Sequence, residues 1–277
     1  MNMTEIKLIC LDMDGTLLDD DHATVPPRNI AALRQAAERG AAVAIASGRA
    51  WSLLQGVNAQ LGVTRYAVLS NGAAVLDVKA GKWIYRRAMD QKARRIIISQ
   101  LLEWGIPFEA YCEGENYIQA DRAEQVLASA LSPEFAQVLR TMSYFPEDLN
   151  AALDGKGVEK IHIFHVPDEL RRQMLDVVEA CGPLAVTTSF VQNMELTAPG
   201  VNKGSAVQAL CRELGLEPTQ VMAFGDAGND LELLRWAGWS FAMGNASDEA
   251  KAAARYVTGT NREGGVGMAV EQYLLNT

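Results

Sequence analysis

Cysteine is scarce in this chain, and no two cysteines lie close together in the sequence. The 277 residues include four of them, Cys10, Cys112, Cys181 and Cys211, and no Cys-x-x-Cys pair occurs. This spacing indicates neither a zinc knuckle nor a disulfide framework. Reduced thiols are the default in the cytoplasm, where we expect this protein to be found.

Long apolar runs and an excess of positive charge are also lacking. No apolar stretch approaches the ~20 residues of a membrane span, and no charged and then apolar leader opens the chain. The formal net charge is -9 and the isoelectric point is about 5.0, which argues against non-specific binding of nucleic acid. We expect neither a nucleic-acid nor a membrane partner, and we expect a monomer or a weak homodimer.

Strand and helix patterns alternate at the start of the chain. Buried strands are predicted at residues 6–11, 41–46 and 66–69, and the helices that follow the first two end at Gly40 and Gly62. This order is typical of a parallel sheet covered by helices on both faces. The predicted fold class is therefore α/β, with a Rossmann-like doubly wound parallel sheet as its core.

This rhythm is interrupted after residue 84. A hairpin is predicted from residues 73–78 and 82–85, and strands and helices then cease to alternate. The first rhythm resumes near Met194. We therefore predict a core domain made of residues 1–84 and 188–277, with an α+β domain inserted at 85–187. Its helical patterns lie at 90–104, 122–130 and 168–180, and its strand patterns at 106–111, 115–120 and 158–165.

Two carboxylates stand at the end of the first strand. The apolar run stops at Asp12, and Asp14, Gly15 and Thr16 follow. Carboxylates are costly to bury at such a place unless they are paired or hold a cation. One carboxylate that attacks and one that moves protons would suit phosphoryl transfer through an aspartyl intermediate. The alternative is a plain Asp-Gly turn after a strand.

Polar residues also follow the other predicted strands of the core. In doubly wound sheets, ligands bind outside the carboxyl ends of the strands. Asp12 and Asp226 could therefore share one Mg²⁺ ion, and Ser47 could open a helix and bind phosphate there. Lys203 is predicted at the start of a helix, where a cation opposes the helix dipole and so suggests a role in a site. The alternatives are an N-cap serine, an Asx-rich turn and a surface lysine. The residues at these strand ends are Ser47 and Gly48, then Asn71, then Asp226, Asn229 and Asp230.

His162 and His165 are the only histidines that lie close together. Residues three apart on a strand face opposite sides of the sheet, so they are poor joint ligands for a metal. We expect one to be a core residue and the other a surface residue.

Four motifs, taken in order, resemble those of the haloacid dehalogenase superfamily. They are Asp12-x-Asp14-Gly15-Thr16-Leu17, Ser47-Gly48-Arg49, Lys203 and Gly225-Asp226-x-x-Asn229-Asp230. Their placement at strand ends, and the position of the inserted region, look like those of its Cof-type phosphatases.

This resemblance implies a role for each motif. Asp12 would be the nucleophile, and Asp14 would be the general acid and base. Ser47, Gly48, Arg49, Asn71, Lys203 and Asn229 would bind the phosphate or the substrate. Mg²⁺ would be held by Asp12, Asp14 through its backbone carbonyl, and Asp226, while Asp230 would orient water on the metal.

The inserted domain would be a cap that covers the site and selects the leaving group. Tyr111, Glu113, Glu115 and Asn116 fall in a predicted cap turn and are candidates for this selection, and a solvated hairpin turn is the alternative.

Three functions remain open at this point. The first is a Mg²⁺-dependent phosphatase acting on a small phosphorylated metabolite, with a sugar phosphate as the leading candidate. The second is a phosphomutase of the same superfamily, which would release an isomerised hexose phosphate in place of free phosphate. The third is a non-catalytic sensor of a phosphorylated metabolite, and the presence of both Asp12 and Asp14 argues against it.

Overall fold

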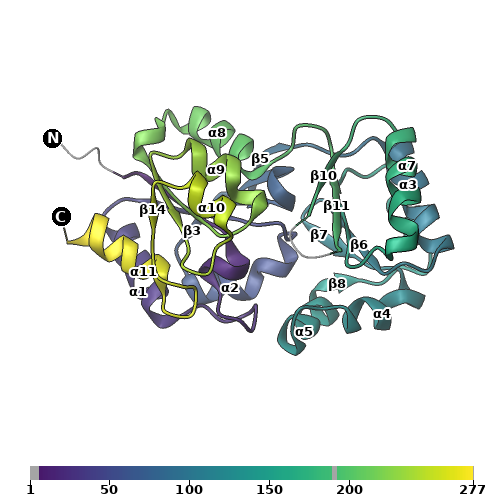
Figure 1. The fold of residues 1–277 in the computed structure, drawn as a ribbon, viewed down its shortest axis with the longest axis horizontal. Coiled ribbons are helices and arrows are strands. Elements are labelled where there is room, and N and C mark those ends of the chain that lie inside the picture. The colour runs from purple at the N-terminus through teal and green to yellow at the C-terminus, as the bar shows by residue number, and fades with distance from the viewer. Residues whose placement is uncertain (1–5, 189–191, 277) are drawn as a thin grey trace.

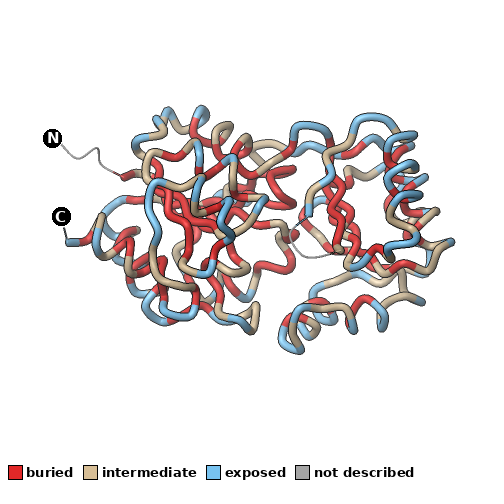
Figure 2. Tube along the Cα trace, in the orientation of Figure 1, coloured by how far each residue is buried: buried red, intermediate tan, exposed pale blue. Residues whose placement is uncertain are grey.

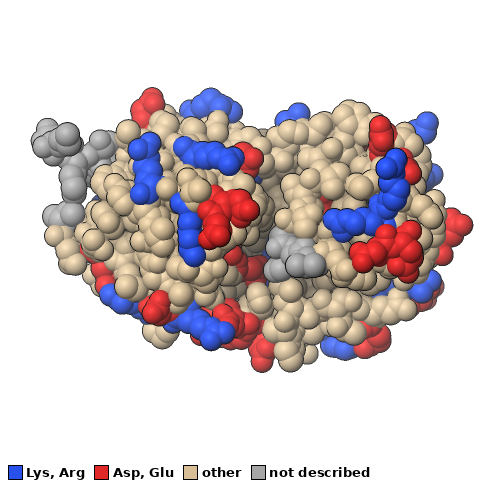
Figure 3. All heavy atoms as spheres, in the orientation of Figure 1, with Lys and Arg blue, Asp and Glu red and all other residues tan. Residues whose placement is uncertain are grey.

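The computed structural model describes residues 6–188 and 192–276 and shows two lobes, each built on its own β-sheet (Figure 1). One sheet has eight strands and the other six. Acidic and basic side chains are interspersed over both lobes on the face that Figure 3 shows. Within the described ranges, no helix is both long and apolar enough to cross a membrane.

The larger lobe is the predicted α/β core. Its strands lie in the order β14-β13-β12-β1-β2-β3-β4-β5. The six strands from β14 to β3 are parallel, and β4 and β5 add the predicted hairpin in antiparallel pairing. The strands are β1 (Leu8–Leu11), β2 (Ala42–Ala46), β3 (Thr64–Leu69), β4 (Ala74–Asp77), β5 (Lys82–Arg86), β12 (Val221–Gly225), β13 (Trp239–Ala242) and β14 (Tyr256–Val257). The helices are α1 (Pro27–Glu38), α2 (Gln55–Leu61), α8 (Lys203–Leu214), α9 (Leu231–Trp236), α10 (Asp248–Ala253) and α11 (Gly265–Val270).

Helices cover both faces of this sheet because its central strands are apolar on both sides. Along β1, Ile9 and Leu11 pack into one hydrophobic cluster, while Leu8 and Cys10 pack into another. Successive side chains of a strand point to opposite faces, so a continuous apolar run can fill two cores. Figure 2 shows the buried strands in the middle of the lobe, enclosed by helices that are exposed on their outer side.

The order of the strands determines where the site is built. β1 lies between β12 and β2 and pairs with both in parallel, with Leu11 opposite Phe224. Asp12 and Asp226 therefore follow neighbouring strands, although more than 200 residues separate them in sequence. The sequence predicted that the strands ending at Asp12 and Asp226 lie near each other. The parallel pairing of β1 with β12 confirms this prediction.

The smaller lobe is an α+β cap. Its sheet has the order β10-β11-β9-β6-β7-β8 and is antiparallel except for the β7–β8 pair. Side chains of α3 and α7 pack against one face of the sheet. The strands are β6 (Phe108–Cys112), β7 (Glu115–Tyr117), β8 (Ser143–Tyr144), β9 (Val158–Ile163), β10 (Ala185–Thr187) and β11 (Met194–Thr197). The helices are α3 (Gln91–Glu103), α4 (Ala123–Ala128), α5 (Pro133–Met142), α6 (Leu149–Ala152) and α7 (Asp168–Ala180).

The return of the chain to the core differs from the predicted boundary at residue 188. β11 pairs with β9 and β10 in the cap sheet, so the cap extends at least to Thr197. An apolar run such as Met194–Leu196 indicates a strand, but it carries no information about which of two sheets the strand joins. The helix α5 and the short elements α6, β8 and β10 were also not anticipated.

Candidate active site

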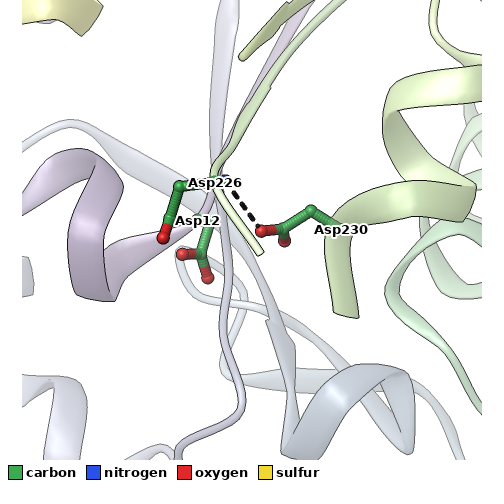
Figure 4. A group of neighbouring side chains, drawn as sticks. All are labelled: Asp12, Asp226 and Asp230. Carbon is green, nitrogen blue, oxygen red and sulfur yellow. Dashed lines mark hydrogen bonds between the residues drawn. The ribbon is translucent and has the colours of Figure 1, made fainter. Parts of the chain in front are cut away.

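Three carboxylates meet at the carboxyl edge of the core sheet. Asp12 follows β1, Asp226 follows β12, and Asp230 ends a short 3-10 turn after Asp226. One carboxylate oxygen of each lies within 4.8 Å of the others. Figure 4 shows the three side chains converging, with the hydrogen bond between Asp226 and Asp230 drawn as a dashed line.

Lys203 supplies the positive charge of this cluster. It is the first residue of α8, whose N-cap Asn202 accepts a hydrogen bond from the Ser205 amide at 2.7 Å. Its Nζ atom donates to Asp12, and to Oδ1 of Asp230 at 2.7 Å. Burial would lower the pKa of Lys203, but the two carboxylates outweigh burial and raise it well above its usual value. The ammonium is thus charged and fully buried.

The carboxylates outnumber this cation. Burial and the nearby Asp230 raise the pKa of Asp12 well above its usual value, and the same two causes raise that of Asp226 to about 6. Full ionisation of the three carboxylates beside one ammonium would leave two negative charges in one buried cluster. Oxygen ligands with this charge suit a hard divalent cation.

Local turns hold the carboxylates of Asp226 and Asp230 in place. Thr16 Oγ1 donates to Asp226 Oδ1 at 2.7 Å, and Asp230 Oδ2 accepts from the amides of Asp226 and Ala227 at 3.0 and 3.2 Å. Gly15 has a φ of 80°, and a Cβ at this position would lie 2.5 Å from Asp226 Oδ2. Glycine is therefore required both by the turn and by the approach of Asp226.

The Asp14 carboxylate is held by two side chains. Arg49 donates from Nε to Oδ2 at 3.0 Å and from Nη2 to Oδ1, and Nδ1 of His22 lies 2.8 Å from Oδ1. Burial alone would raise the pKa of Asp14, but Arg49 and His22 outweigh burial and hold it well below its usual value. Asp14 is ionised in this arrangement. The Arg49 guanidinium also lies 4.0 Å from the ring centre of Phe135, a residue of cap helix α5.

Ser47 does not open a helix, in contrast to the expectation. The next helical turn begins at Ser52, and Ser47 Oγ accepts the Arg49 amide at 3.1 Å within the loop after β2. This local hydrogen bond allows the loop to turn without a helix. Gly48 lies beside it, and a Cβ there would be 2.9 Å from Asn71 Oδ1.

A pocket lined by residues of both lobes lies at these groups. Six of the predicted site residues line it, namely Asp12, Asp14, Gly48, Arg49, Asp226 and Asn229. Lys203 and Asp230 contact Asp12 and Asp226, and Ser47 and Asn71 adjoin Gly48. Lys203 and Asn71 line a second pocket, which shares Asn229 with the first.

Of the four residues of the predicted cap turn, only Tyr111 lines the pocket. Glu113 is exposed and accepts a hydrogen bond from Arg86 at 3.2 Å. Asn116 is buried and donates to Glu109 at 2.8 Å, and Glu115 is half-buried outside the pocket lining. The turn is thus neither a solvated hairpin nor a set of four substrate contacts.

Six cap residues of the pocket were not anticipated, namely the apolar Leu131 and Phe135 and the polar Glu109, Lys160, His162 and Glu195. His162 is half-buried and lines the pocket, and His165 is the exposed one of the two histidines. Burial would raise the pKa of Glu195, but Lys160 lowers it to about 2, so the Glu195 carboxylate stays ionised. Charged residues at alternate positions of strands that are otherwise apolar were the signal that could have found the four polar ones.

Comparison with known proteins agrees with this geometry. A family model described as haloacid dehalogenase-like hydrolase matches residues 9–270. A 5-amino-6-(5-phospho-D-ribitylamino)uracil phosphatase of Bacillus subtilis is 27% identical over 98% of this chain and 97% of that protein. The HMP-PP phosphatase of Serratia proteamaculans is 30% identical over 88% of this chain and 86% of that protein.

Solved structures give the same result. A haloacid dehalogenase-like hydrolase of B. subtilis has a TM-score of 0.83 at 26% identity, covering 97% of this chain and 100% of that one. The chain belongs to the haloacid dehalogenase-like hydrolases, with a core and cap of that fold. The family assignment made from the four motifs is confirmed, and so is the prediction of an enzyme of the phosphatase class, as the relatives are named.

Proposed function

We propose that this protein is a Mg²⁺-dependent phosphatase that hydrolyses a small phosphorylated metabolite through an aspartyl-phosphate intermediate. The observation that carries the proposal is the position of Asp12. Its carboxylate lines the pocket between core and cap, and it accepts a hydrogen bond from the buried Lys203 ammonium. A carboxylate in contact with a fixed cation can approach an anionic phosphoryl group without unbalanced repulsion.

Asp12 would attack phosphorus, and the bond between phosphorus and the leaving oxygen would break. Asp14 would give its proton to that oxygen and then take a proton from the water that attacks the aspartyl phosphate. The ionised state that Arg49 imposes on Asp14 suits the second step. The first step needs a protonated Asp14, so Arg49 must release it when the leaving group enters the pocket. Lys203 and Ser47 would bind the phosphoryl oxygens.

The carboxylate cluster fits a magnesium ion. Asp12, Asp226 and the backbone carbonyl of Asp14 would hold it, and Asp230, which is pinned by backbone amides, would orient its water. The bound ion would supply positive charge toward the phosphoryl oxygens. The remaining expectations, a cytoplasmic location and a monomer or weak homodimer, belong to this proposal.

Replacement of the nucleophile tests the covalent mechanism. Asp12→Asn should abolish hydrolysis of 4-nitrophenyl phosphate, while the control Asp154→Asn, on an exposed side chain of the cap, should keep the wild-type rate. Rapid acid quenching of the wild type should trap one phosphoryl group per chain on Asp12, detected by mass spectrometry. Activity of the freshly prepared Asp12→Asn variant above a trace would overturn the aspartyl-phosphate mechanism.

Removal of the metal tests the second part of the proposal. Chelation should abolish hydrolysis, and Mg²⁺ should restore it. Excess Ca²⁺ should inhibit, because it takes more ligands at longer distances than Mg²⁺. A rate that chelation leaves unchanged would exclude the proposed role of Asp226.

A further inference from the structure

The cap contributes one face of its sheet to the pocket. In the register of the strands, Glu109 of β6 and Glu195 of β11 both lie opposite His162 of β9. Tyr111 of β6 lies opposite Lys160 of β9 on the same face. We call these five residues the cap wall. Apart from Glu159, the residues that alternate with them are apolar and pack on the other face of the sheet, so the cap wall is set by strand geometry.

His162 is fixed through one of its ring nitrogens. Its Nδ1 atom lies 2.9 Å from Glu109 Oε1. Glu109 also accepts the Tyr111 hydroxyl at 2.6 Å and the Asn116 amide at 2.8 Å. Because the carboxylate accepts from all three partners, Nδ1 of His162 carries the hydrogen. The second nitrogen, Nε2, has no hydrogen-bond partner among the described residues, and the side chain lines the pocket.

Lys160 is already balanced by a carboxylate. Its Nζ atom donates to Glu195 Oε1 at 2.6 Å, and Glu195 Oε2 accepts the Asn71 amide at 2.7 Å. Lys160 and Glu195 are both buried. Lys160 can still donate a further N–H to a ligand, but the pair brings no spare positive charge to the pocket.

The charges of the cap wall do not sum to a positive value in either state of the imidazole. Glu109 and Glu195 contribute two negative charges, Lys160 one positive charge, and His162 one at most. A second phosphate or carboxylate on the leaving group would therefore meet one uncompensated negative charge beside a neutral His162, and no net positive charge beside a protonated one. A hydroxyl can donate to Nε2 of the neutral imidazole or accept from the protonated one.

We infer that His162 binds a hydroxyl of the leaving group, and that the enzyme prefers an uncharged, hydroxyl-rich phosphate monoester to one with a second anionic group. The inference rests on the proposed phosphatase function. It makes His162 a residue that determines specificity, while the reaction at phosphorus remains with Asp12 and Asp14.

The variant His162→Asn separates these roles. An asparagine amide takes the place of Nδ1 and can still donate to Glu109, but the side chain has no counterpart of Nε2. The matched control is His165→Asn, because His165 is exposed and lies outside the pocket. Mannitol 1-phosphate and hexyl phosphate are the two substrates, since both release a six-carbon primary alcohol and only mannitol carries further hydroxyls.

His162→Asn should lower kcat/KM for mannitol 1-phosphate about 10-fold, the equivalent of one lost hydrogen bond, and should leave hexyl phosphate within about 2-fold. His162→Gln, whose longer amide reaches the place of Nε2, should recover part of the loss. His165→Asn should change neither substrate. Equal losses on both substrates, or no loss on either, would overturn the role of His162 and leave the phosphatase function standing if the wild type is active.

The preference for an uncharged leaving group is tested with mannitol 1,6-bisphosphate, whose two phosphates are equivalent by symmetry. Wild-type kcat/KM per phosphate should be at least about 10-fold lower than for mannitol 1-phosphate at low ionic strength, because a second anion faces Glu109 and Glu195. An equal or higher value for the bisphosphate would overturn the preference for an uncharged leaving group. A wild-type protein without activity on any phosphate ester would instead contradict the proposed function.

Discussion

The contact of Lys203 with two carboxylates predicts the largest single effect on stability. Lys203→Met removes a fully buried ammonium and leaves a side chain of similar length in its place. Asp12, Asp226 and Asp230 then face one another within 4.8 Å without a cation. Removing one partner of a buried ion pair costs about 3–5 kcal/mol, because the remaining charge stays buried and unpaired.

The metal offers a way to recover part of this loss. An ion that binds only the folded chain stabilises it by about 2.7 kcal/mol when its concentration is 100 times its Kd. Lys203 and a metal both draw on Asp12, so the wild type should gain less from Mg²⁺ than Lys203→Met does. In Lys203→Met, the substitution should therefore lower the unfolding free energy, and added Mg²⁺ should raise it by more than in the wild type.

Urea denaturation of the variants, with and without Mg²⁺, measures both effects. The comparison is made at pH 8, above the pKa of about 6 of Asp226, so that this carboxylate is ionised in the wild type. The control is Lys79→Met, on an exposed lysine of the β4–β5 turn. A Lys203→Met midpoint equal to that of Lys79→Met in metal-free buffer would refute the electrostatic account of the cluster. So would a Mg²⁺ response smaller than that of the wild type.

Two further predictions concern single positions. Gly15→Ala places a Cβ 2.5 Å from Asp226 Oδ2, so activity at limiting Mg²⁺ should fall by at least about 10-fold, the effect of a displaced metal ligand. Gly81→Ala has a similar positive φ of 62° but open space around the Cβ, so it should lose only stability; equal activity of the two variants would contradict the contact with Asp226. Burial raises the pKa of Glu159 to about 7, although Arg86 opposes this. A carboxyl with a raised pKa stabilises the fold while it is protonated, so the unfolding free energy should fall by about 3 kcal/mol as the pH rises from 4.5 to 7. Glu159→Gln should flatten this fall, and an unchanged pH profile of the variant would show that Glu159 is not its cause.

The position of the site could be predicted because parallel strands bring their carboxyl ends to one edge. Asp12 and Asp226 each follow an apolar strand, and this local fact was enough to place them together. The partners that hold them were harder to predict. Thr16 binds Asp226 through a turn whose geometry depends on the finished sheet, and Asn245 Nδ2 donates to the Gly15 carbonyl at 2.8 Å across 230 residues.

The cap was predicted less well because its local patterns leave the strand partners undetermined. The run at Met194–Thr197 has the same appearance whether it joins the core sheet or the cap sheet, and only the pairing with β9 decides. His162 was compared with His165 alone, as if both lay on one strand, whereas β9 ends at Ile163. Alternation along a strand also gives no information about which face lines a pocket. The neighbours that give His162 a role, Glu109 and Glu195, come from strands on either side of it.

The charged face of the cap sheet is difficult to explain by stability. Glu109, Lys160 and Glu195 are 0%, 1% and 4% exposed, whereas the opposite face packs apolar side chains against helices. Replacing a buried ion pair by well-packed apolar residues is often neutral or stabilising, so a sheet that only closed the pocket would have no need of these charges. Their hydrogen bonds instead fix polar atoms opposite Asp12 before a ligand arrives, and such fixed groups bind at a lower entropic cost than free ones. The alternation that gives the cap its apolar core thus also gives it a polar surface that can distinguish one leaving group from another.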